Sequence, residues 1–248
     1  MSVLLEVSEL SVRFGGVRAV DAVSIDVRRD SIMGLIGPNG AGKTTTIDAL
    51  CGFVPSTGRV SLAERRVDGL PAHQRARAGL VRTFQSVELF DDLTIRENLL
   101  VAATSPHWWS PLIDALMPLR SALGVDIDFA LAVVGLESFA AARPLELSHG
   151  QRRLAGVART LAARPKLVLL DEPAAGLDPA ETAALGAMLR TLPSLGIGVL
   201  LVDHDMTLVL DVCTEITVLD FGRVIATGPP AVVRNDRAVI AAYLGGAP

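Results

Sequence analysis

The sequence has few of the residues on which several protein classes depend. Only two of its 248 residues are cysteines, Cys51 and Cys213, and they lie far apart without a CxxC pattern. This excludes a disulfide framework and favours two buried free thiols in a reducing compartment. Lysine and arginine together number 23 against 27 acidic residues, which gives a net charge of −4. No basic field therefore points to nucleic-acid binding.

Long apolar runs are also missing. The longest stretch without charge, residues 98–113, is shorter than the ~20 apolar residues that a membrane-spanning helix needs, and Pro106 and Pro111 interrupt it. The first residues include Glu6 and Glu9 and no basic leader, so we expect no secretory signal peptide. Half of the residues are nevertheless apolar, which argues against disorder and predicts a substantial core.

Short apolar strands alternate with helical segments at both ends of the chain. The predicted strands are residues 3–10, 22–27, 31–37, 58–62, 80–85, 166–171 and 197–203, followed by a hairpin within 215–228. A capping box at 94–97 opens a helix, and residues 104–145 are mostly helical. This pattern predicts an α/β core that holds a helical insertion.

A phosphate-binding loop is the clearest motif. Residues 37–44, GPNGAGKT, fit the pattern G-x-x-x-x-G-K-[ST] after an apolar strand and before a helix. The backbone N–H groups of such a loop cradle an anion, and the N-terminus of the helix adds its positive dipole end. Lys43 would reach the outer phosphates, while the Thr44 hydroxyl would ligate Mg²⁺. The expected nucleotide-binding residues are Gly37, Pro38, Asn39, Gly40, Ala41, Gly42, Lys43, Thr44 and Thr45.

Two acidic residues end the apolar strand in LVLLDEP. Asp171 stands at the tip of this strand, where a carboxylate can hold the magnesium shell. Glu172 follows it and could polarise an attacking water. Together with the phosphate-binding loop, these residues predict a P-loop NTPase. The sequence has no N-K-x-D motif, so nothing indicates guanine recognition.

Further motifs resemble those of the ATP-binding-cassette (ABC) ATPases. LSHGQ at 147–151 is similar to the family's signature motif, and AAGLD at 174–178 resembles its D-loop. LLVDHD places His204 where the family has its switch histidine, and Gln85 in VRTFQ fits the Q-loop. Phe14 suits the aromatic residue that stacks on adenine. The resemblance covers essentially the whole chain.

Within that family, VRFGGVRAV, LDEPAAGLDPAET and VIAAYLG resemble the ATPases of branched-chain amino-acid importers. The urea and amide importer ATPases share much of this pattern and stay open as alternatives. The resemblance implies a RecA-like core with an N-terminal antiparallel β subdomain and an inserted helical signature subdomain. Residues 1–248 would form one ATP-binding domain, with a core lobe of about 1–85 and 160–248 and a helical lobe of about 86–159.

The resemblance also implies how the site works with ATP and Mg²⁺. Two cassettes would face each other head to tail, so that ATP lies between the phosphate-binding loop of one and the signature of the other. The signature would contribute Ser148, Gly150 and Gln151, whereas His149 is assigned no role. Asp178 of the D-loop would contact the partner subunit.

The catalytic residues implied by the family are Glu172 as general base, His204 as the contact to the γ-phosphate, and Lys43. Gln85 would sense the metal and join Thr44 and Asp171 as a metal ligand.

The implied partners are transmembrane permease subunits, a second cassette that is either identical or a sister subunit, and, indirectly, a solute-binding protein. No nucleic acid is expected. The chain would lie peripherally at the cytoplasmic face of the inner membrane. The segment 86–120, with Trp108 and Trp109, is a candidate for contact with the permease, although these tryptophans could instead pack under a loop of the helical lobe.

Two other classes fit the sequence less well. DNA-repair and chromosome-structure ATPases of the same superfamily insert long coiled coils, but Lys43 and Ser148 are only 105 positions apart and no heptads lie between them. A regulatory module that has lost hydrolysis would not need an intact Lys43, Asp171, Glu172 and His204.

Overall fold

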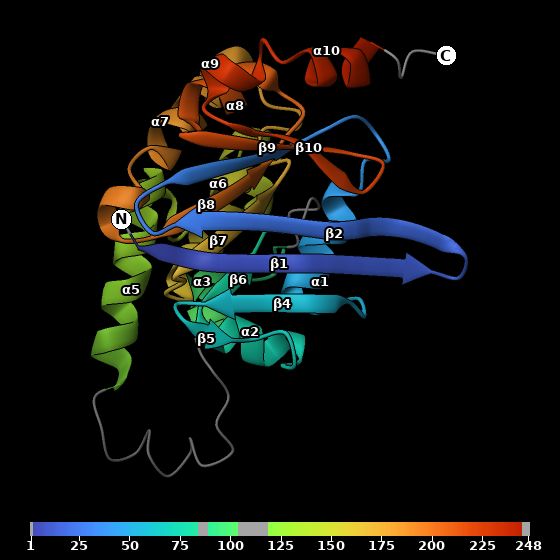
Figure 1. Ribbon diagram of the computed structural model, residues 1–248. Coiled ribbons are helices and arrows are strands. Elements are labelled where there is room, and N and C mark those ends of the chain that lie inside the picture. Colours follow the sequence, from blue (N-terminus) through green and yellow to red (C-terminus); the bar gives the residue numbers. More distant parts are fainter. Residues whose placement is uncertain (1, 84–88, 104–118, 245–248) are drawn as a thin grey trace.

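A computed structural model of the protein describes residues 2–83, 89–103 and 119–244. Gln85, Trp108, Trp109 and most of the segment 86–120, for which roles are predicted above, lie outside these residues. Within the described part, an antiparallel sheet, a mostly parallel sheet and a set of helices form the α/β fold that the sequence predicts (Figure 1).

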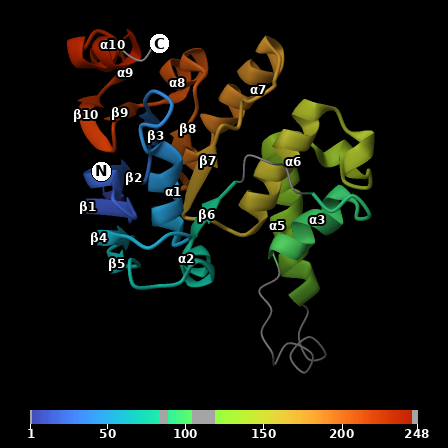
Figure 2. The same cartoon turned by 90° about the vertical axis from the view of Figure 1, so that its right-hand side faces the viewer.

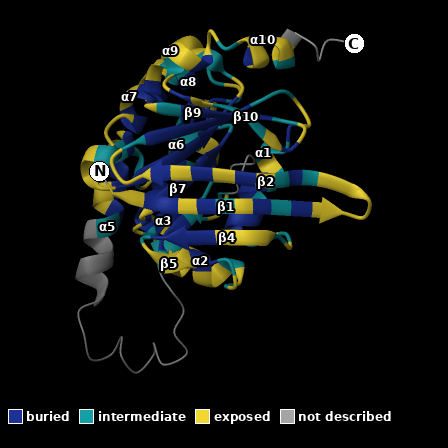
Figure 3. Ribbon diagram, in the orientation of Figure 1, coloured by how far each residue is buried: buried dark blue, intermediate teal, exposed yellow. Residues whose placement is uncertain are grey.

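The N-terminal sheet is antiparallel, with strand order β2-β1-β4-β5. Its strands are β1 (Val3–Phe14), β2 (Val17–Arg28), β4 (Thr57–Leu62) and β5 (Arg65–Arg66). The first two strands are longer than predicted. The predicted ranges, residues 3–10 and 22–27, cover only part of each strand. Buried and exposed residues alternate along most of both strands, while the tip of the β1–β2 hairpin is exposed (Figure 3).

The second sheet has the order β10-β9-β3-β8-β7-β6 and is parallel except for the final hairpin. Its strands are β3 (Ile32–Ile36), β6 (Leu80–Arg82), β7 (Leu167–Asp171), β8 (Gly198–Val202), β9 (Glu215–Asp220) and β10 (Arg223–Gly228). All residues of β3, β7 and β8 are buried, which explains their uninterrupted apolar sequences. Because parallel strands end at one edge, the loops after β3, β8, β7 and β6 lie side by side.

The helices divide into two groups (Figure 2). Helix α1 (Lys43–Cys51) lies between the two sheets, and its buried residues belong to the same apolar cluster as the N-terminal strands. The helical lobe consists of α3 (Ile95–Ala103), α5 (Leu119–Val134) and α6 (His149–Ala162), which pack against one another. The remaining core helices are α2 (Ala72–Ala78), α7 (Pro179–Leu189), α8 (Met206–Val212), α9 (Pro230–Val233) and α10 (Arg237–Leu244).

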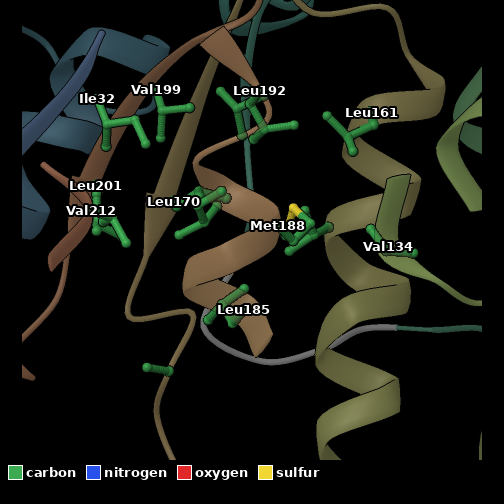
Figure 4. Packing of buried hydrophobic residues seen from close by; sticks show 14 of the residues in the cluster. Ile32, Val134, Leu161, Leu170, Leu185, Met188, Leu192, Val199, Leu201 and Val212 are labelled. Atoms are coloured by element: carbon green, nitrogen blue, oxygen red, sulfur yellow. The ribbon is translucent and has the colours of Figure 1, made fainter. Parts of the chain in front are cut away.

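A continuous apolar core joins the parallel sheet to the helical lobe. Successive residues of the central strands alternate between two clusters, so that Leu169 faces α1 and the N-terminal sheet while Leu170 faces the other side. In Figure 4, Met188 of α7 lies between Leu170 on the sheet side and Leu161 of α6. The lobes therefore share packing, which fixes the signature helix α6 relative to the sheet.

Several local predictions are confirmed and one is too long. Thr94 and Glu97 form the predicted capping box before α3, since each backbone N–H bonds to the other side chain. Both cysteines are buried and free. The strand predicted at 80–85 is too long, since β6 ends at Arg82. None of the described helices is long and apolar enough to cross a membrane.

Candidate functional site

The loop 37–42 joins β3 to α1 and approaches neighbouring backbone closely. Gly37 has φ 152, and a Cβ at this position would stand 2.1 Å from the carbonyl oxygen of Leu219. Only glycine fits so close to the β9 backbone. Gly42 is the N-cap of α1, and no side chain caps this helix. The first N–H groups of α1 are therefore left for an anion.

Lys43 folds back over this loop. Its Nζ donates hydrogen bonds to the carbonyl oxygens of Gly37 at 2.8 Å and Pro38 at 3.0 Å. Burial lowers the pKa of the Lys43 ammonium, and the negative charges of Glu172 and Asp171 oppose this effect. The ammonium thus lies in the hollow of the loop and faces both acidic residues of the LVLLDEP segment.

Asp171 ends β7 and is almost fully buried. Its Oδ2 accepts a hydrogen bond from Arg82 Nη2 at 2.7 Å, whereas its Oδ1 is buried without any hydrogen-bond partner. Burial raises the pKa of the Asp171 carboxyl, and the hydrogen bond and charge of Arg82 oppose that rise. A buried carboxylate oxygen without a partner is costly unless a ligand takes it.

The donor set suits Mg²⁺. Asp171 Oδ1 would be one oxygen ligand, and the exposed Thr44 hydroxyl in the first turn of α1 would be a second. Mg²⁺ is bound through one or two carboxylates plus substrate phosphates, and keeps several waters. The described residues contain no group of three or more His, Cys, Asp or Glu side chains placed to hold a metal, so they form no all-protein cage. Gln85, the third predicted ligand, lies outside them.

Glu172 has an unusual backbone conformation for its residue type. Its φ is 49°, in the left-handed region that non-glycine residues seldom adopt. The Glu172 N–H donates to the carbonyl oxygen of Val202 at 2.7 Å, which extends the pairing of β7 with β8. Its side chain is 32% exposed, and its Oε2 stands 4.0 Å from Nδ1 of His204 in the loop after β8. The predicted base and the predicted switch histidine therefore lie together at the end of the sheet.

Asp203 holds these two loops together. The carboxylate is buried, its Oδ2 accepts from the Ala174 N–H at 3.1 Å, and its Oδ1 accepts from the Asp205 N–H at 2.9 Å. It therefore connects the segment after Glu172 with the segment around His204. Asp203 is not among the predicted site residues, although it follows an apolar strand as Asp171 ends one.

The signature segment begins helix α6. Ser148 is its N-cap, with the Gln151 N–H donating to Ser148 Oγ at 3.2 Å and the Ser148 N–H donating to Gln151 Oε1 at 2.9 Å. Ser148 is exposed, so the cap lies at the surface of this chain. Gly150 is buried against Glu181, and a Cβ on Gly150 would stand 2.2 Å from Glu181 Oε1. His149 lies against Gly176, because its Cε1 is 3.1 Å from where a Cβ of Gly176 would stand.

Asp178 of the predicted D-loop caps helix α7. Its Oδ1 accepts from the N–H groups of Ala180 and Glu181, both at 2.8 Å, and Glu181 Oε2 accepts from the Asp178 N–H at 3.1 Å. The signature and the D-loop therefore contact each other within one chain, through Glu181 and His149. Sequence spacing gives no sign of this contact.

Phe14 stands at the end of β1, on the hairpin tip, and is 51% exposed. It is not a core residue of the sheet. The partner strand β2 passes the phosphate-binding loop, where the carbonyl of Ala19 is next to Gly42. The hairpin that carries Phe14 thus borders the predicted nucleotide site.

Comparisons with known proteins show the family to which this chain is similar. The ABC transporter family profile matches residues 20–175, and the profile of the branched-chain amino acid ATP-binding cassette transporters matches residues 223–248. The high-affinity branched-chain amino acid transport ATP-binding protein LivG of Salmonella typhimurium is 42% identical, with 98% of each chain covered. The lipopolysaccharide export system ATP-binding protein LptB of Haemophilus influenzae is 35% identical, over 98% of this chain and 97% of its own.

Among solved structures, the ADP conformation of MJ1267, an ATP-binding cassette of an ABC transporter, superposes with a TM-score of 0.86 and 28% identity. It covers 99% of this chain and 100% of its own length.

Proposed function

This chain belongs to the ABC transporter family of ATP-binding cassettes, and on that premise we propose that it is the ATP-hydrolysing subunit of an importer for branched-chain amino acids. Its 42% identity to LivG across 98% of both chains supports this function, as does the match of residues 223–248 to the branched-chain cassette profile. Identity to the lipopolysaccharide exporter subunit is lower, at 35%. We assign about residues 1–85 and 160–248 to the core lobe and about residues 86–159 to the helical lobe.

Four groups at one edge of the parallel sheet are the main support for the proposed ATPase activity. Lys43 lies in the phosphate-binding loop with its Nζ facing the loop carbonyls. The orphaned Oδ1 of Asp171, the Glu172 carboxylate and the His204 imidazole stand at the ends of the adjacent strands β7 and β8. This set contains a phosphate contact, a metal ligand, a base and a second polar contact, which is what hydrolysis of a phosphoanhydride requires.

Each residue has a defined part in the reaction. The loop 37–45 and the uncapped N-terminus of α1 bind the phosphates, and Lys43 leaves the carbonyls of Gly37 and Pro38 to pair with the outer ones. Thr44 and Asp171 would hold Mg²⁺, which would supply positive charge to neutralise the charge that develops on the phosphates. Phe14 stacks on the base.

Glu172 accepts the proton of the attacking water at its carboxylate, and His204 holds the γ-phosphate in line with that water. The hydrogen bond from the Glu172 N–H to the Val202 carbonyl and the hydrogen bonds of Asp203 keep these two loops in register. Electrostatic positioning supplies most of the rate enhancement.

The signature acts on a second cassette. Ser148 and Gly150 present a hydroxyl and a backbone amide at the N-terminus of the 14-residue helix α6, whose dipole favours a phosphate. Ser148 is exposed at the surface of this chain, so that an approaching cassette can bring ATP to it. Gln151 keeps Ser148 in place through the capping box. ATP then joins two cassettes, and its hydrolysis releases them, which shifts the population between closed and open pairs.

The remaining partners follow from this role. A permease dimer binds the cassettes and places them at the cytoplasmic face of the inner membrane, while a solute-binding protein delivers the amino acid on the other side. Gln85 and the segment 86–120, including Trp108 and Trp109, are assigned to metal sensing and permease contact. The second cassette is either a copy of this chain or a sister subunit.

Transport reconstitution tests the function. The chain is reconstituted in proteoliposomes with the permease and solute-binding subunits that co-purify with it, and uptake of labelled leucine and labelled urea is measured with ATP inside. We expect leucine uptake and an ATPase rate that rises with the loaded solute-binding protein. Urea uptake without leucine uptake would assign the chain to the urea and amide importers instead.

A further inference from the structure

Arg82 links the two elements that carry the proposed magnesium ligands. It is the last residue of β6, and its side chain is 8% exposed. Its Nη2 donates to Asp171 Oδ2 at 2.7 Å, and its Nη1 pairs with the Asp48 carboxylate of α1. One guanidinium thus joins the end of β7 to the helix that begins at the phosphate-binding loop.

The position of Asp48 makes this link relevant to the metal. Asp48 lies four residues after Thr44 on α1, so both side chains are on the same face of the helix, one turn apart. Arg82 therefore holds α1 through Asp48, one helical turn after the proposed metal ligand Thr44. It also holds the other proposed ligand, Asp171, directly. The distance between the Thr44 hydroxyl and the Asp171 carboxylate depends on this bridge.

The two oxygens of Asp171 have different surroundings. Oδ2 is occupied by Arg82, while Oδ1 is buried with no hydrogen-bond partner. A carboxylate held by one oxygen cannot rotate freely, so its second oxygen keeps a constant direction. The planar fork of an arginine can serve two carboxylates at fixed angles, whereas the single ammonium of a lysine cannot.

We propose that Arg82 is a positioning residue for the metal: by gripping Asp171 through Oδ2 and α1 through Asp48, it sets the geometry of the Asp171 and Thr44 oxygens that bind Mg²⁺. This inference rests on the proposed function, since it concerns the metal that accompanies the nucleotide. Groups that orient metal ligands change metal affinity or activity by about 10-fold to 100-fold when they are removed.

A purely electrostatic role of Arg82 makes the opposite prediction. A guanidinium next to a divalent cation repels it, so removing that charge alone would strengthen metal binding. The positioning role requires that metal binding weaken, even when the charge is kept. The sign of the change in Arg82→Lys and Arg82→Gln therefore separates the two roles.

The test measures metal binding without turnover. Mn²⁺ is titrated into the chain saturated with ADP, and free Mn²⁺ is followed by electron paramagnetic resonance. ADP binding in EDTA and the thermal unfolding midpoint are measured for each variant. The variants are Arg82→Lys, Arg82→Gln and Asp48→Asn. Arg77→Lys is the matched control, since Arg77 is exposed on α2 and lines the same cavity of about 540 Å³ as Arg82.

We expect Arg82→Lys to weaken Mn²⁺ binding about 10-fold or more, with unchanged ADP binding in EDTA. Asp48→Asn should also weaken Mn²⁺ binding, but by less, because Arg82 still holds Asp171. Arg77→Lys should bind Mn²⁺ with the wild-type affinity. Wild-type Mn²⁺ affinity in Arg82→Lys, or tighter Mn²⁺ binding in Arg82→Gln, would overturn the proposal.

If Arg82→Gln does not fold, Arg82→Lys and Asp48→Asn decide the question. Failure of the wild-type chain to bind ADP and Mn²⁺ at all would contradict the proposed function itself.

Discussion

A double-mutant cycle between Gly150 and Glu181 tests the contact between the signature and the D-loop. Gly150 is buried in the first turn of α6, where a Cβ would stand 2.2 Å from Glu181 Oε1 and 2.5 Å from Glu181 Cδ. Replacing Gly150 with alanine must therefore push the Glu181 side chain away. Glu181 would then lose its bond to the Asp178 N–H, which is one arm of the α7 capping box.

Two effects of Gly150→Ala oppose each other. Alanine is more favourable than glycine within a helix by about 1 kcal/mol. Loss of the capping arm at α7 costs about 1 kcal/mol. We therefore expect the single variant to unfold with nearly the wild-type free energy. In a Glu181→Ala background the Glu181 arm of the capping box is already absent, while Asp178 still caps α7, so Gly150→Ala should raise the free energy of unfolding by about 1 kcal/mol.

The measurement is urea unfolding of the wild type, both single variants and the double variant, followed by circular dichroism. The expected interaction energy between the two sites is about 1 kcal/mol. Independent sites add within about 0.3 kcal/mol. If the effects of the two substitutions on the free energy of unfolding add that closely, the contact is refuted.

Three further predictions concern the core and the edge of the sheet. Asp203→Ala leaves one buried and one partly buried N–H group without their acceptor and should lower the free energy of unfolding by about 2 kcal/mol, with a smaller loss for Asp203→Asn; equal urea midpoints would contradict this. Burial raises the pKa of both Cys51 and Cys213 to about 12, so a disulfide reagent at pH 8 should label neither thiol before denaturant is added, and rapid labelling of the native chain would be the contrary result. Leu170→Ala should cost about 2–5 kcal/mol in urea unfolding while Leu145→Ala, at a site that is 73% exposed, should cost little; similar losses would disprove the assigned core.

Local sequence patterns were enough to predict most of the fold. The four apolar residues before Asp171 identify a strand buried on both faces, and the capping box at Thr94 locates the start of a helix. These features depend on neighbours in the chain, which a sequence shows directly. The phosphate-binding loop was found for the same reason, since all its groups lie within eight residues.

Contacts between distant segments could not be predicted in this way. Arg82 and Asp171 are 89 residues apart, and their ion pair follows from the parallel pairing of β6 with β7. Asp203 likewise binds the Ala174 N–H only because β8 lies beside β7. His149 was assigned no role, but the packing of its ring against Gly176 depends on how α6 approaches the loop before α7. Each of these contacts is set by strand order and helix packing, which local spacing does not encode.

The central claim is that Glu172 is the base in a site that only a second cassette completes. It is tested most directly by Glu172→Gln, with turnover, bound nucleotide and molar mass by light scattering measured on the same sample in ATP and Mg²⁺. We predict that turnover falls by about 100-fold or more, that ATP stays bound, and that the chain is paired with a second cassette. Turnover at the wild-type rate, or ATP held by an unpaired chain, would contradict the account.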